Sequence, residues 1–243
     1  MAEIETPLSR MNLLVGEDKV KSLQNKCVMI VGVGGVGSYA AEAIARMGVG
    51  KIILVDKDKI AYSNLNRQIH ATFNTINQDK CEAMKDRILS FRNDCEVICK
   101  SMFYSEENND EIFDCSVDFV VDAIDTMSSK MALIQYCIKN KIPFISSMGM
   151  ANRLDPTKIV ICDLMKTTYD PVAKIMRNLV RKNKINAKIP VVFSSEQPIT
   201  QTKVINEEGT TRKEKMPPAS SPFVPCAAGL AIASYVLKKL VNI

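Results

Sequence analysis

The feature that most constrains this chain is a glycine-rich segment between an apolar run and an alanine-rich stretch. Residues 27–31, Cys-Val-Met-Ile-Val, are all apolar and predict a strand buried on both faces. Residues 32–37, Gly-Val-Gly-Gly-Val-Gly, follow directly, and the alanine-rich stretch after them predicts a helix that ends at Gly48. A strand, a glycine turn and a helix in this order are typical of the phosphate-binding end of a βαβ unit.

Each glycine has its own place in this prediction. Gly32 permits the tight turn, Gly34 lets a phosphate approach the backbone, and Gly37 lets the helix pack closely on the strand. Gly35 lies between them and is assigned to the same loop. The N-terminus of the helix offers free N–H groups and a partial positive charge to an anion. A glycine turn without any ligand is the alternative that the pattern leaves open.

Strands and helices are predicted to alternate through most of the chain. After the glycine loop, the pattern favours strands at 51–56, 96–102, 117–125 and 142–147, and a further antiparallel extension at 158–163. The predicted helices lie within 7–23, 78–92, 128–141, 170–188 and 227–241. This alternation predicts an α/β fold with a doubly wound, mostly parallel, Rossmann-like sheet. Without a repeat or a clear linker, we expect one domain over 1–243, with a polar, mobile loop at about 201–222.

Composition and cysteine spacing limit the classes of function. The 243 residues are 47% hydrophobic and carry a net charge of +5, which permits an anionic partner without requiring one. The 8 cysteines are scattered and form no Cys-x-x-Cys pair, so we expect no zinc site of the paired type. Reduced thiols and the lack of a signal-like start favour a cytoplasmic protein. The apolar tract at 226–237 is too short and too rich in small residues to favour a membrane span.

Two charged residues stand where a bound nucleotide would need them. Asp56 ends the strand predicted at 51–56, where an acid can accept both hydroxyls of a ribose, although it could also cap a turn. Lys80 begins the helix predicted after the polar loop 58–70, an unfavourable position for a cation in the helix dipole. We therefore expect an anion to hold Lys80, with an ordinary solvated lysine as the alternative.

Three other groups of residues are open to two interpretations. The segment 170–188 is basic, and its cations could contact RNA phosphates or form a solvated helix face. His70, the one histidine, is either structural or a substrate contact, and Cys226 could be a reactive or an inert buried thiol. The candidate tRNA-binding cations are Lys174, Arg177, Arg181, Lys182 and Lys184.

Taken in order, these residues resemble the ThiF/MoeB/HesA superfamily of adenylating enzymes, which are related to ubiquitin-activating enzymes. The resemblance covers essentially the whole chain. Beyond the glycine loop, the matching residues are Arg10, Asp56, the Asn64-Leu-Asn66-Arg67-Gln68 stretch, Lys80, and Asp125 in Asp122-Ala-Ile-Asp125. Without paired zinc cysteines, and with matching stretches at 166–174, 191–198 and 223–229, the chain is most similar to the tRNA threonylcarbamoyladenosine dehydratase family.

This resemblance implies a reaction and a set of roles. Family members use ATP and magnesium to adenylate the threonyl carboxylate of the modified adenosine, and the neighbouring carbamoyl group then closes a ring and expels AMP. The resemblance assigns the phosphates to the glycine loop and the nucleotide site to Asn64. It assigns ribose to Asp56, phosphate charge to Arg67 and Lys80, and magnesium to Asp125. It also implies a homodimer in which Arg10 reaches the other subunit's site, and some members bind Na⁺ or K⁺.

Three alternatives stay open at this point. An NAD-dependent oxidoreductase would use the same glycine loop and Asp56, but it gives no task to Arg67 and Lys80. A non-catalytic nucleotide-binding adaptor is disfavoured by the intact set of charged residues. The third alternative keeps the chemistry and adenylates the C-terminus of a ubiquitin-like or sulfur-carrier protein, and a sulfur-relay partner would fit a reactive Cys226.

Overall fold

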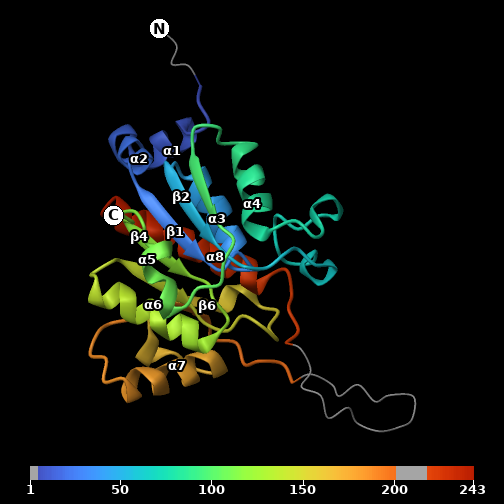
Figure 1. The fold of residues 1–243 in the computed structure, drawn as a ribbon, viewed down its shortest axis with the longest axis vertical. Coiled ribbons are helices and arrows are strands. Elements are labelled where there is room, and N and C mark those ends of the chain that lie inside the picture. Colours follow the sequence, from blue (N-terminus) through green and yellow to red (C-terminus); the bar gives the residue numbers. More distant parts are fainter. Residues whose placement is uncertain (1–4, 201–217) are drawn as a thin grey trace.

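The computed structural model describes residues 5–200 and 218–243, which form one seven-stranded sheet between layers of helices (Figure 1). The strands are β1 (Cys27–Val31), β2 (Lys51–Val55), β3 (Glu96–Lys100), β4 (Phe119–Asp122), β5 (Phe144–Ser147), β6 (Ile159–Asp163) and β7 (Pro190–Ser194). The helices are α1 (Ser9–Val15), α2 (Glu17–Gln24), α3 (Gly37–Arg46), α4 (Lys80–Leu89), α5 (Asn109–Ile112), α6 (Met127–Lys139), α7 (Pro171–Lys182) and α8 (Val224–Leu240).

The strand order places a ligand site at the middle of the sheet. The order is β3-β2-β1-β4-β5-β7-β6, and every neighbouring pair is parallel except β7 with β6. The order reverses between β1 and β4, and open α/β sheets bind ligands outside the carboxyl ends of the strands at such a point. The predicted doubly wound, mostly parallel sheet with an antiparallel extension is therefore confirmed.

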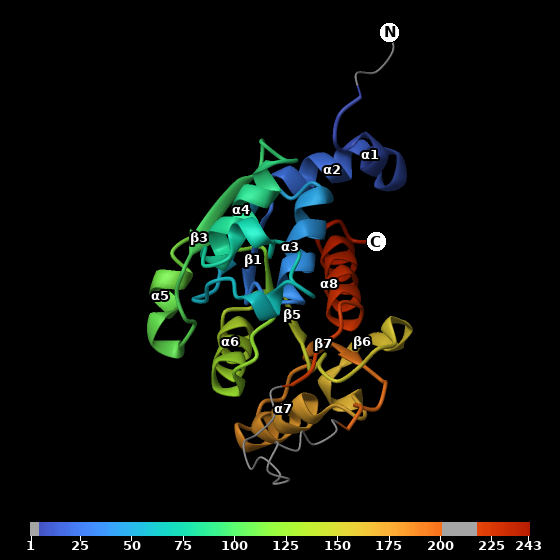
Figure 2. The same cartoon turned by 90° about the vertical axis from the view of Figure 1, so that its right-hand side faces the viewer.

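Two hydrophobic clusters hold the helices on opposite faces of the sheet. Alternate residues of β1 point to opposite faces, so Val28 and Ile30 pack under α3, α4 and α8, whereas Met29 and Val31 pack under α6 and α7. Figure 2 shows α3 beside α8, away from α6 and α7. The contact of α8 with α3 is close, because a Cβ atom at Gly229 would lie 2.5 Å from the backbone oxygen of Val36.

The predicted elements are present, and two boundaries differ in ways that matter for the site. The strand expected at 117–125 ends at Asp122, so Asp125 lies in the loop that follows β4. The helix expected within 170–188 ends at Lys182, and Lys184 has a positive φ of 53°. The strand β7 had no prediction of its own. No helix in the described ranges is long and apolar enough to cross a membrane.

Only the end of the polar loop expected at 201–222 belongs to the described residues, since 201–217 lie outside them. Residues 218–222 are hydrogen-bonded to the loop after β5. The Asn152 N–H donates to the Ala219 oxygen at 2.8 Å, and the Ser221 hydroxyl donates to the Arg153 oxygen at 3.0 Å. The entry to α8 is thereby joined to the carboxyl edge of the sheet.

Candidate nucleotide-binding site

A cleft of about 900 Å³ opens at the carboxyl ends of the central strands. Its wall includes the glycine loop after β1, the ends of β2 and β4, the polar loop before α4, and the segment after β5. The sequence-predicted residues that line it are Gly32, Gly34, Gly35, Asp56, Asn64, Arg67, Lys80 and Asp125. Residues from separate parts of the sequence are therefore brought to one cleft.

The glycine loop leaves the backbone accessible where a phosphate would bind. Gly32 has a φ of +93°, and a Cβ atom there would lie 2.5 Å from the Ala123 oxygen. A Cβ atom at Gly37 would overlap the carbonyl oxygen of Gly32, so α3 begins directly against the turn. At Gly34 the nearest atom to such a Cβ is Nε2 of Gln68, at 4.0 Å. Gly34 thus presents an open backbone surface beside the N-terminus of α3.

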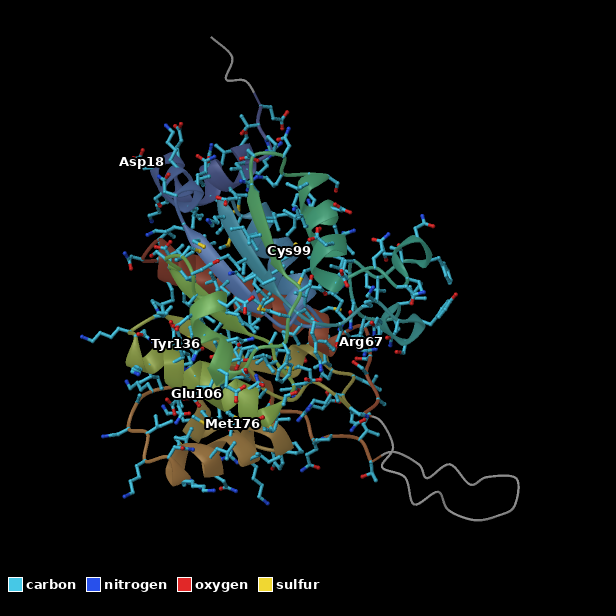
Figure 3. All side chains as sticks on the ribbon, viewed as in Figure 1. Asp18, Arg67, Cys99, Glu106, Tyr136 and Met176 are labelled. Atoms are coloured by element: carbon cyan, nitrogen blue, oxygen red, sulfur yellow. The ribbon has the colours of Figure 1, made fainter. Side chains whose placement is uncertain are left out.

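The loop before α4 lies beside the glycines and forms the adjoining part of the wall. Arg67, which is labelled in Figure 3, belongs to this loop. Its side chain passes close to Gly35, and its Nη1 donates to the Ser63 oxygen at 2.6 Å and to Oδ1 of Asn66 at 2.9 Å. Asn64 is buried, and its Oδ1 accepts the Ala61 N–H at 3.0 Å, which shapes the turn. Gln68 is buried as well, and its Oε1 has no hydrogen-bond partner among the described residues. An unpaired buried acceptor in a cleft wall is a position where a ligand can donate.

Lys80 and two aspartates form a charged cluster at the end of β2. The Lys80 side chain is only 8% exposed, and its Nζ lies 2.8 Å from Oδ2 of Asp58 and 3.8 Å from Oδ1 of Asp56. Asp56 also accepts the Val33 N–H at 2.7 Å, which joins β2 to the glycine loop. Lys80 therefore has the anionic partners that its unfavourable helix position predicts. The pattern did not single out Asp58, which reaches Lys80 because the Lys80 N–H donates to its carbonyl oxygen at 3.1 Å.

Asp125 lies at the rim of the cleft and is exposed. Its Oδ1 accepts the Thr126 hydroxyl at 3.4 Å. Among residues 5–200 and 218–243, no group of three or more His, Cys, Asp or Glu side chains could hold a metal ion. A single carboxylate nevertheless suits Mg²⁺, which usually binds one or two carboxylates and takes its other ligands from phosphates and water.

Arg153 organises the opposite end of the cleft, and nothing in its local sequence indicated this. The residue is 2% exposed, and its guanidinium donates to four carbonyl oxygens, those of Gly149, Ala151, Tyr169 and Glu196, at 2.7–3.2 Å. Burial lowers the pKa of Arg153. Burial also raises the pKa of Asp170, whose Oδ2 lies 3.8 Å from Arg153 Nη2, beyond hydrogen-bond range.

The cleft wall does not include Arg10, His70 or Cys226, and it does not include Gly37 either. Arg10 is exposed on α1, which precedes β1 and lies at the other end of the sheet (Figure 1). His70 is buried, and its pKa is lowered to about 4 by burial and further by Lys80 and Arg87. Cys226 is buried in the first turn of α8 with its Sγ 3.8 Å from the Arg67 oxygen. Burial raises the pKa of this thiol, so the protonated form dominates at neutral pH.

The basic residues at the end of α7 lie at some distance from the cleft. Pro171 at the start of α7 lines the cleft, and the basic last turn is about 16 Å further along the helix axis. Arg177 is half-buried, and its Nη1 donates to the backbone oxygen and the hydroxyl of Thr167. The cations with exposed side chains are Lys174, Arg181, Lys182 and Lys184.

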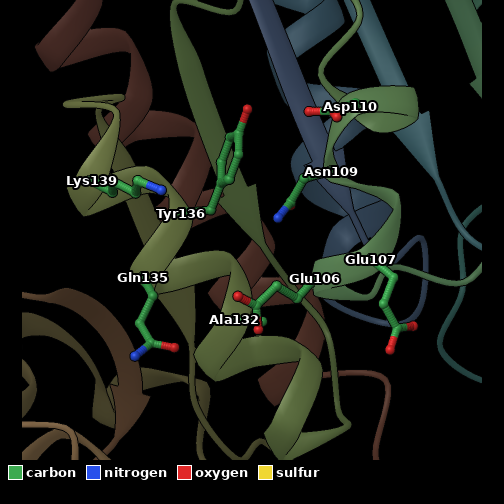
Figure 4. A pocket seen from close by; sticks show the side chains of 8 residues that line it. All are labelled: Glu106, Glu107, Asn109, Asp110, Ala132, Gln135, Tyr136 and Lys139. Atoms are coloured by element: carbon green, nitrogen blue, oxygen red, sulfur yellow. The ribbon is translucent and has the colours of Figure 1, made fainter.

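A second cavity, of about 410 Å³, lies between α6 and the segment that leads into α5 (Figure 4). Its wall carries the carboxylates of Glu106, Glu107 and Asp110, together with Tyr136 and Lys139. Three carboxylates would repel a triphosphate. The cleft, with its glycine loop, Arg67 and Lys80, is therefore the candidate nucleotide site.

Comparisons with known proteins agree with this geometry. The family model described as the ThiF family matches residues 8–242. The tRNA threonylcarbamoyladenosine dehydratase of Bacillus subtilis is 47% identical over 96% of this chain and 94% of its own, and that of Escherichia coli is 35% identical over 92% and 84%. The crystal structure of the Escherichia coli tRNA N6-threonylcarbamoyladenosine dehydratase in complex with ATP has a TM-score of 0.86 at 32% identity, covering 97% of this chain and 94% of that one.

Proposed function

This chain belongs to the ThiF family, and we propose that it is a tRNA threonylcarbamoyladenosine dehydratase. In this reaction ATP drives the cyclisation of threonylcarbamoyladenosine in tRNA through an acyl-adenylate. The observation that carries the proposal is the gathering of the glycine loop, Asp56, Arg67, Lys80 and Asp125 around one cleft at the reversal point of the sheet. An oxidoreductase would have no use for these two cations.

The cleft supports the first chemical step, attack of a carboxylate on the α-phosphate of ATP. The open backbone at Gly34 and the N-terminus of α3 would receive phosphate. The Oε1 of Gln68, which has no partner among the described residues, would accept a hydrogen bond from the nucleotide. Asp56 stands at the end of β2 for the ribose hydroxyls. Arg67 and Lys80 would neutralise the charge that develops on the phosphates, which is the principal way such a transfer is accelerated.

Asp125 would hold the magnesium ion that accompanies the triphosphate. When bound, Mg²⁺ neutralises phosphate charge and orients the leaving group. The carboxylate is exposed at the rim, so water can complete the coordination of the ion.

The second step needs no nucleophile from the protein. The carbamoyl group of the modified adenosine attacks the activated carbonyl carbon, the new ring bond forms, and the bond to AMP breaks. The raised pKa of Cys226 supports this route, because a protonated thiol is a weak nucleophile. The protein's tasks are then to orient the modified base and to exclude water from the acyl-adenylate.

We propose further that the enzyme acts as a homodimer. Arg10 lies at the opposite end of the sheet from the cleft of its own chain. Leu13 and Leu14, on the same short helix, are 79% and 77% exposed, which gives that helix an apolar surface for a second copy. A composite site predicts that Arg10→Ala and Lys80→Ala chains, mixed as heterodimers, regain part of the activity that each lacks alone.

The decisive test is direct. The protein would be incubated with ATP, magnesium and threonylcarbamoyl-modified tRNA, and the digested nucleosides weighed by mass spectrometry. Loss of one water per modified adenosine, together with release of AMP, is the expected result. An unchanged nucleoside mass, with adenylate instead forming on the C-terminus of a ubiquitin-like or sulfur-carrier protein, would assign the same chemistry to the other substrate class.

A further inference from the structure

A buried ion pair lies directly behind the cleft. Asp122, the last residue of β4, and Lys130, on α6, each have side chains that are 1% exposed, and Lys130 Nζ lies 2.9 Å from Asp122 Oδ2. The hydroxyl of Ser146, on the neighbouring strand β5, donates to the same carboxylate oxygen at 2.5 Å. Lys130 Nζ is also 3.4 Å from the Ser146 hydroxyl. The three side chains therefore close a small polar cluster in an otherwise apolar layer.

Fold stability alone does not explain this cluster. Removing two charges from water costs desolvation free energy, and the electrostatic attraction between them offsets only part of that cost. Well-packed apolar side chains of similar size often stabilise a core equally well or better. An ion pair in this position is therefore better explained by the geometry that it imposes.

The other oxygen of Asp122 shows which part of the molecule is held. Asp122 Oδ1 accepts the N–H of Ile124 at 3.1 Å, and Ile124 directly precedes Asp125. Between them, the Ala123 N–H donates to the Val31 oxygen at 2.8 Å, and the Ala123 oxygen occupies the space in which a Cβ atom of Gly32 would lie. Residues 122–126, the β4 exit segment, thus contact the glycine turn and carry Asp125 to the rim of the cleft.

We infer that Asp122, Lys130 and Ser146 are positioning residues for the adenylation step. Lys130 and Ser146 fix the Asp122 carboxylate, and the carboxylate fixes the β4 exit segment through the Ile124 N–H. Asp125 is then held at the rim, where the phosphates of ATP would bind. The backbone of Ala123 in the same segment packs against the turn at Gly32. The inference rests on the ATP-dependent reaction proposed above, but its structural part can be tested without that reaction.

Two double variants separate the hydrogen-bond acceptor from the charge. Asp122→Leu with Lys130→Met replaces the pair with apolar side chains, which should fold but cannot accept the Ile124 N–H. Asp122→Asn with Lys130→Gln is neutral and keeps an oxygen for that N–H. Hydrogen–deuterium exchange of the peptide that contains residues 122–126 measures the segment itself, and kcat and KM for ATP measure the consequence.

We expect the two double variants, the apolar pair and the neutral polar pair, to differ in exchange rate and in kcat. In the apolar pair we expect exchange at Ile124 to rise about tenfold, as for the loss of one hydrogen bond. We expect kcat to fall about 10- to 100-fold, as is typical for partners that orient a ligating group. The KM for ATP should change little, because Asp56, Arg67 and Gln68 remain in place. The neutral polar pair should stay within about threefold of the wild type in all three measurements, since the acceptor is retained.

Controls keep the inference falsifiable. Arg92→Met removes another buried cation, which contacts Asp94 and the Ala45 oxygen away from the cleft, and it should lower the melting temperature but leave kcat unchanged. Wild-type exchange and kcat in the apolar pair, or equal losses in both pairs, would overturn the inference. If the double variants do not fold, Ser146→Ala should still raise exchange and lower kcat by about two- to fivefold, and no change would be decisive against it. Failure of the wild type to convert tRNA would overturn the proposed function and leave the exchange result standing.

Discussion

The two ends of the cleft use charged side chains in different ways. At the nucleotide end, Lys80 lies between Asp56 and Asp58, and the side chain of Asp58 is 53% exposed. The Oε1 of Gln68 is unpaired within residues 5–200 and 218–243. At the opposite end, where the modified adenosine would bind in the proposed reaction and which we call the substrate end, the guanidinium of Arg153 is enclosed by four backbone oxygens and faces no solvent. At the nucleotide end, Lys80 is placed to bind a ligand, whereas at the other end Arg153 connects segments of the backbone to one another.

This difference predicts opposite consequences for the loss of one cation. A cation that would bind the ligand contributes mainly to the reaction rate and little to folding stability, because its partners in the free protein stay partly hydrated. A cation that is enclosed contributes mainly to folding, because its removal leaves several buried acceptors without donors. The expected effects below follow from this contrast.

The largest expected effect is on stability, at the substrate end. Arg153→Met would leave the oxygens of Gly149, Ala151 and Glu196 without their donor and the Asp170 carboxyl without its nearest cation. We expect the free energy of unfolding to fall by about 3–5 kcal/mol, as for other broken buried charge networks. Urea unfolding measures this, with the exposed Arg181→Met as the matched control, which should stay within about 0.5 kcal/mol of the wild type. A stability loss no larger than that of the control would remove the distinction between the two ends.

The next effect is on rate, at the nucleotide end. Lys80→Ala should lower the rate of AMP formation with modified tRNA by about 10²–10³, as for other lost electrostatic contacts to a transition state. Its effect on unfolding should be smaller than that of Arg153→Met, because Asp58 can be hydrated once the lysine is removed. Lys59→Ala is the control, since Lys59 pairs with Asp79, the residue before Lys80, but its side chain is 67% exposed. A rate in Lys80→Ala equal to that of the control would make Lys80 a purely structural residue.

The same contrast explains what the sequence could predict. The nucleotide end is built from short contiguous pieces, so Gly32, Gly34 and Asp56 stand at fixed positions relative to their own strands. The position of Lys80 at the start of α4 was itself a signal, because a lysine is unfavourable there. Local patterns of this kind are visible in a single sequence, and the residues that they indicate line one part of the cleft.

The substrate end could not be predicted in this way. Arg153 acts on carbonyl oxygens from residue 149 to residue 196, and any residue type supplies such an oxygen. The pairing of Lys130 with Asp122 likewise depends on how α6 packs behind β4, and an isolated lysine within a helix gives no sign of burial. The strand boundary at Asp122 differs from the predicted one for the same reason. Ala123 and Ile124 are apolar and continue the pattern of the strand, but the Ile124 N–H donates to the Asp122 side chain and not to a neighbouring strand.

A smaller effect depends on pH and concerns His70, behind the nucleotide end. Its pKa in the folded protein is about 4, below the ordinary value of 6.5. Burial disfavours the charged form of the ring, and the positive charges of Lys80 and Arg87 lower the pKa further. As the pH falls below 6.5, the unfolded chain therefore binds a proton at His70 that the folded chain does not bind until about pH 4. This contribution to stability is present above pH 6.5 and is lost as the pH falls towards 4. Between pH 7 and 5 the loss should be about 2 kcal/mol.

His70→Leu tests this directly, since both ring nitrogens lack hydrogen-bond partners among the described residues and an apolar side chain can take their place. The sequence has 1 histidine, so no other imidazole contributes in this range. The variant should lose the decline in unfolding free energy between pH 7 and 5 while keeping the acid unfolding that carboxyl groups cause at lower pH. An identical decline in both proteins would show that His70 is accessible to protons in the fold.

The smallest expected effect concerns the exposed cations at the end of α7. Because Arg177 donates to Thr167, we restrict the candidate tRNA-binding residues to those with exposed side chains. The variant is Arg181→Gln, Lys182→Gln and Lys184→Gln. Each phosphate contact contributes about −0.7 to −0.9 to the slope of log affinity against log salt concentration. The triple variant should therefore flatten the slope for tRNA by about two to three units, with ATP binding and unfolding nearly unchanged because exposed charges add little stability.

The matched control is a second triple variant, Lys139→Gln, Lys141→Gln and Lys239→Gln, which removes the same charge elsewhere on the surface. Lys141 shares the positive φ of Lys184. If both triples flatten the slope equally, the effect is one of net charge, and the end of α7 is a solvated face; a loss confined to the α7 triple would extend the substrate end of the molecule beyond the cleft to the helix that begins at its wall.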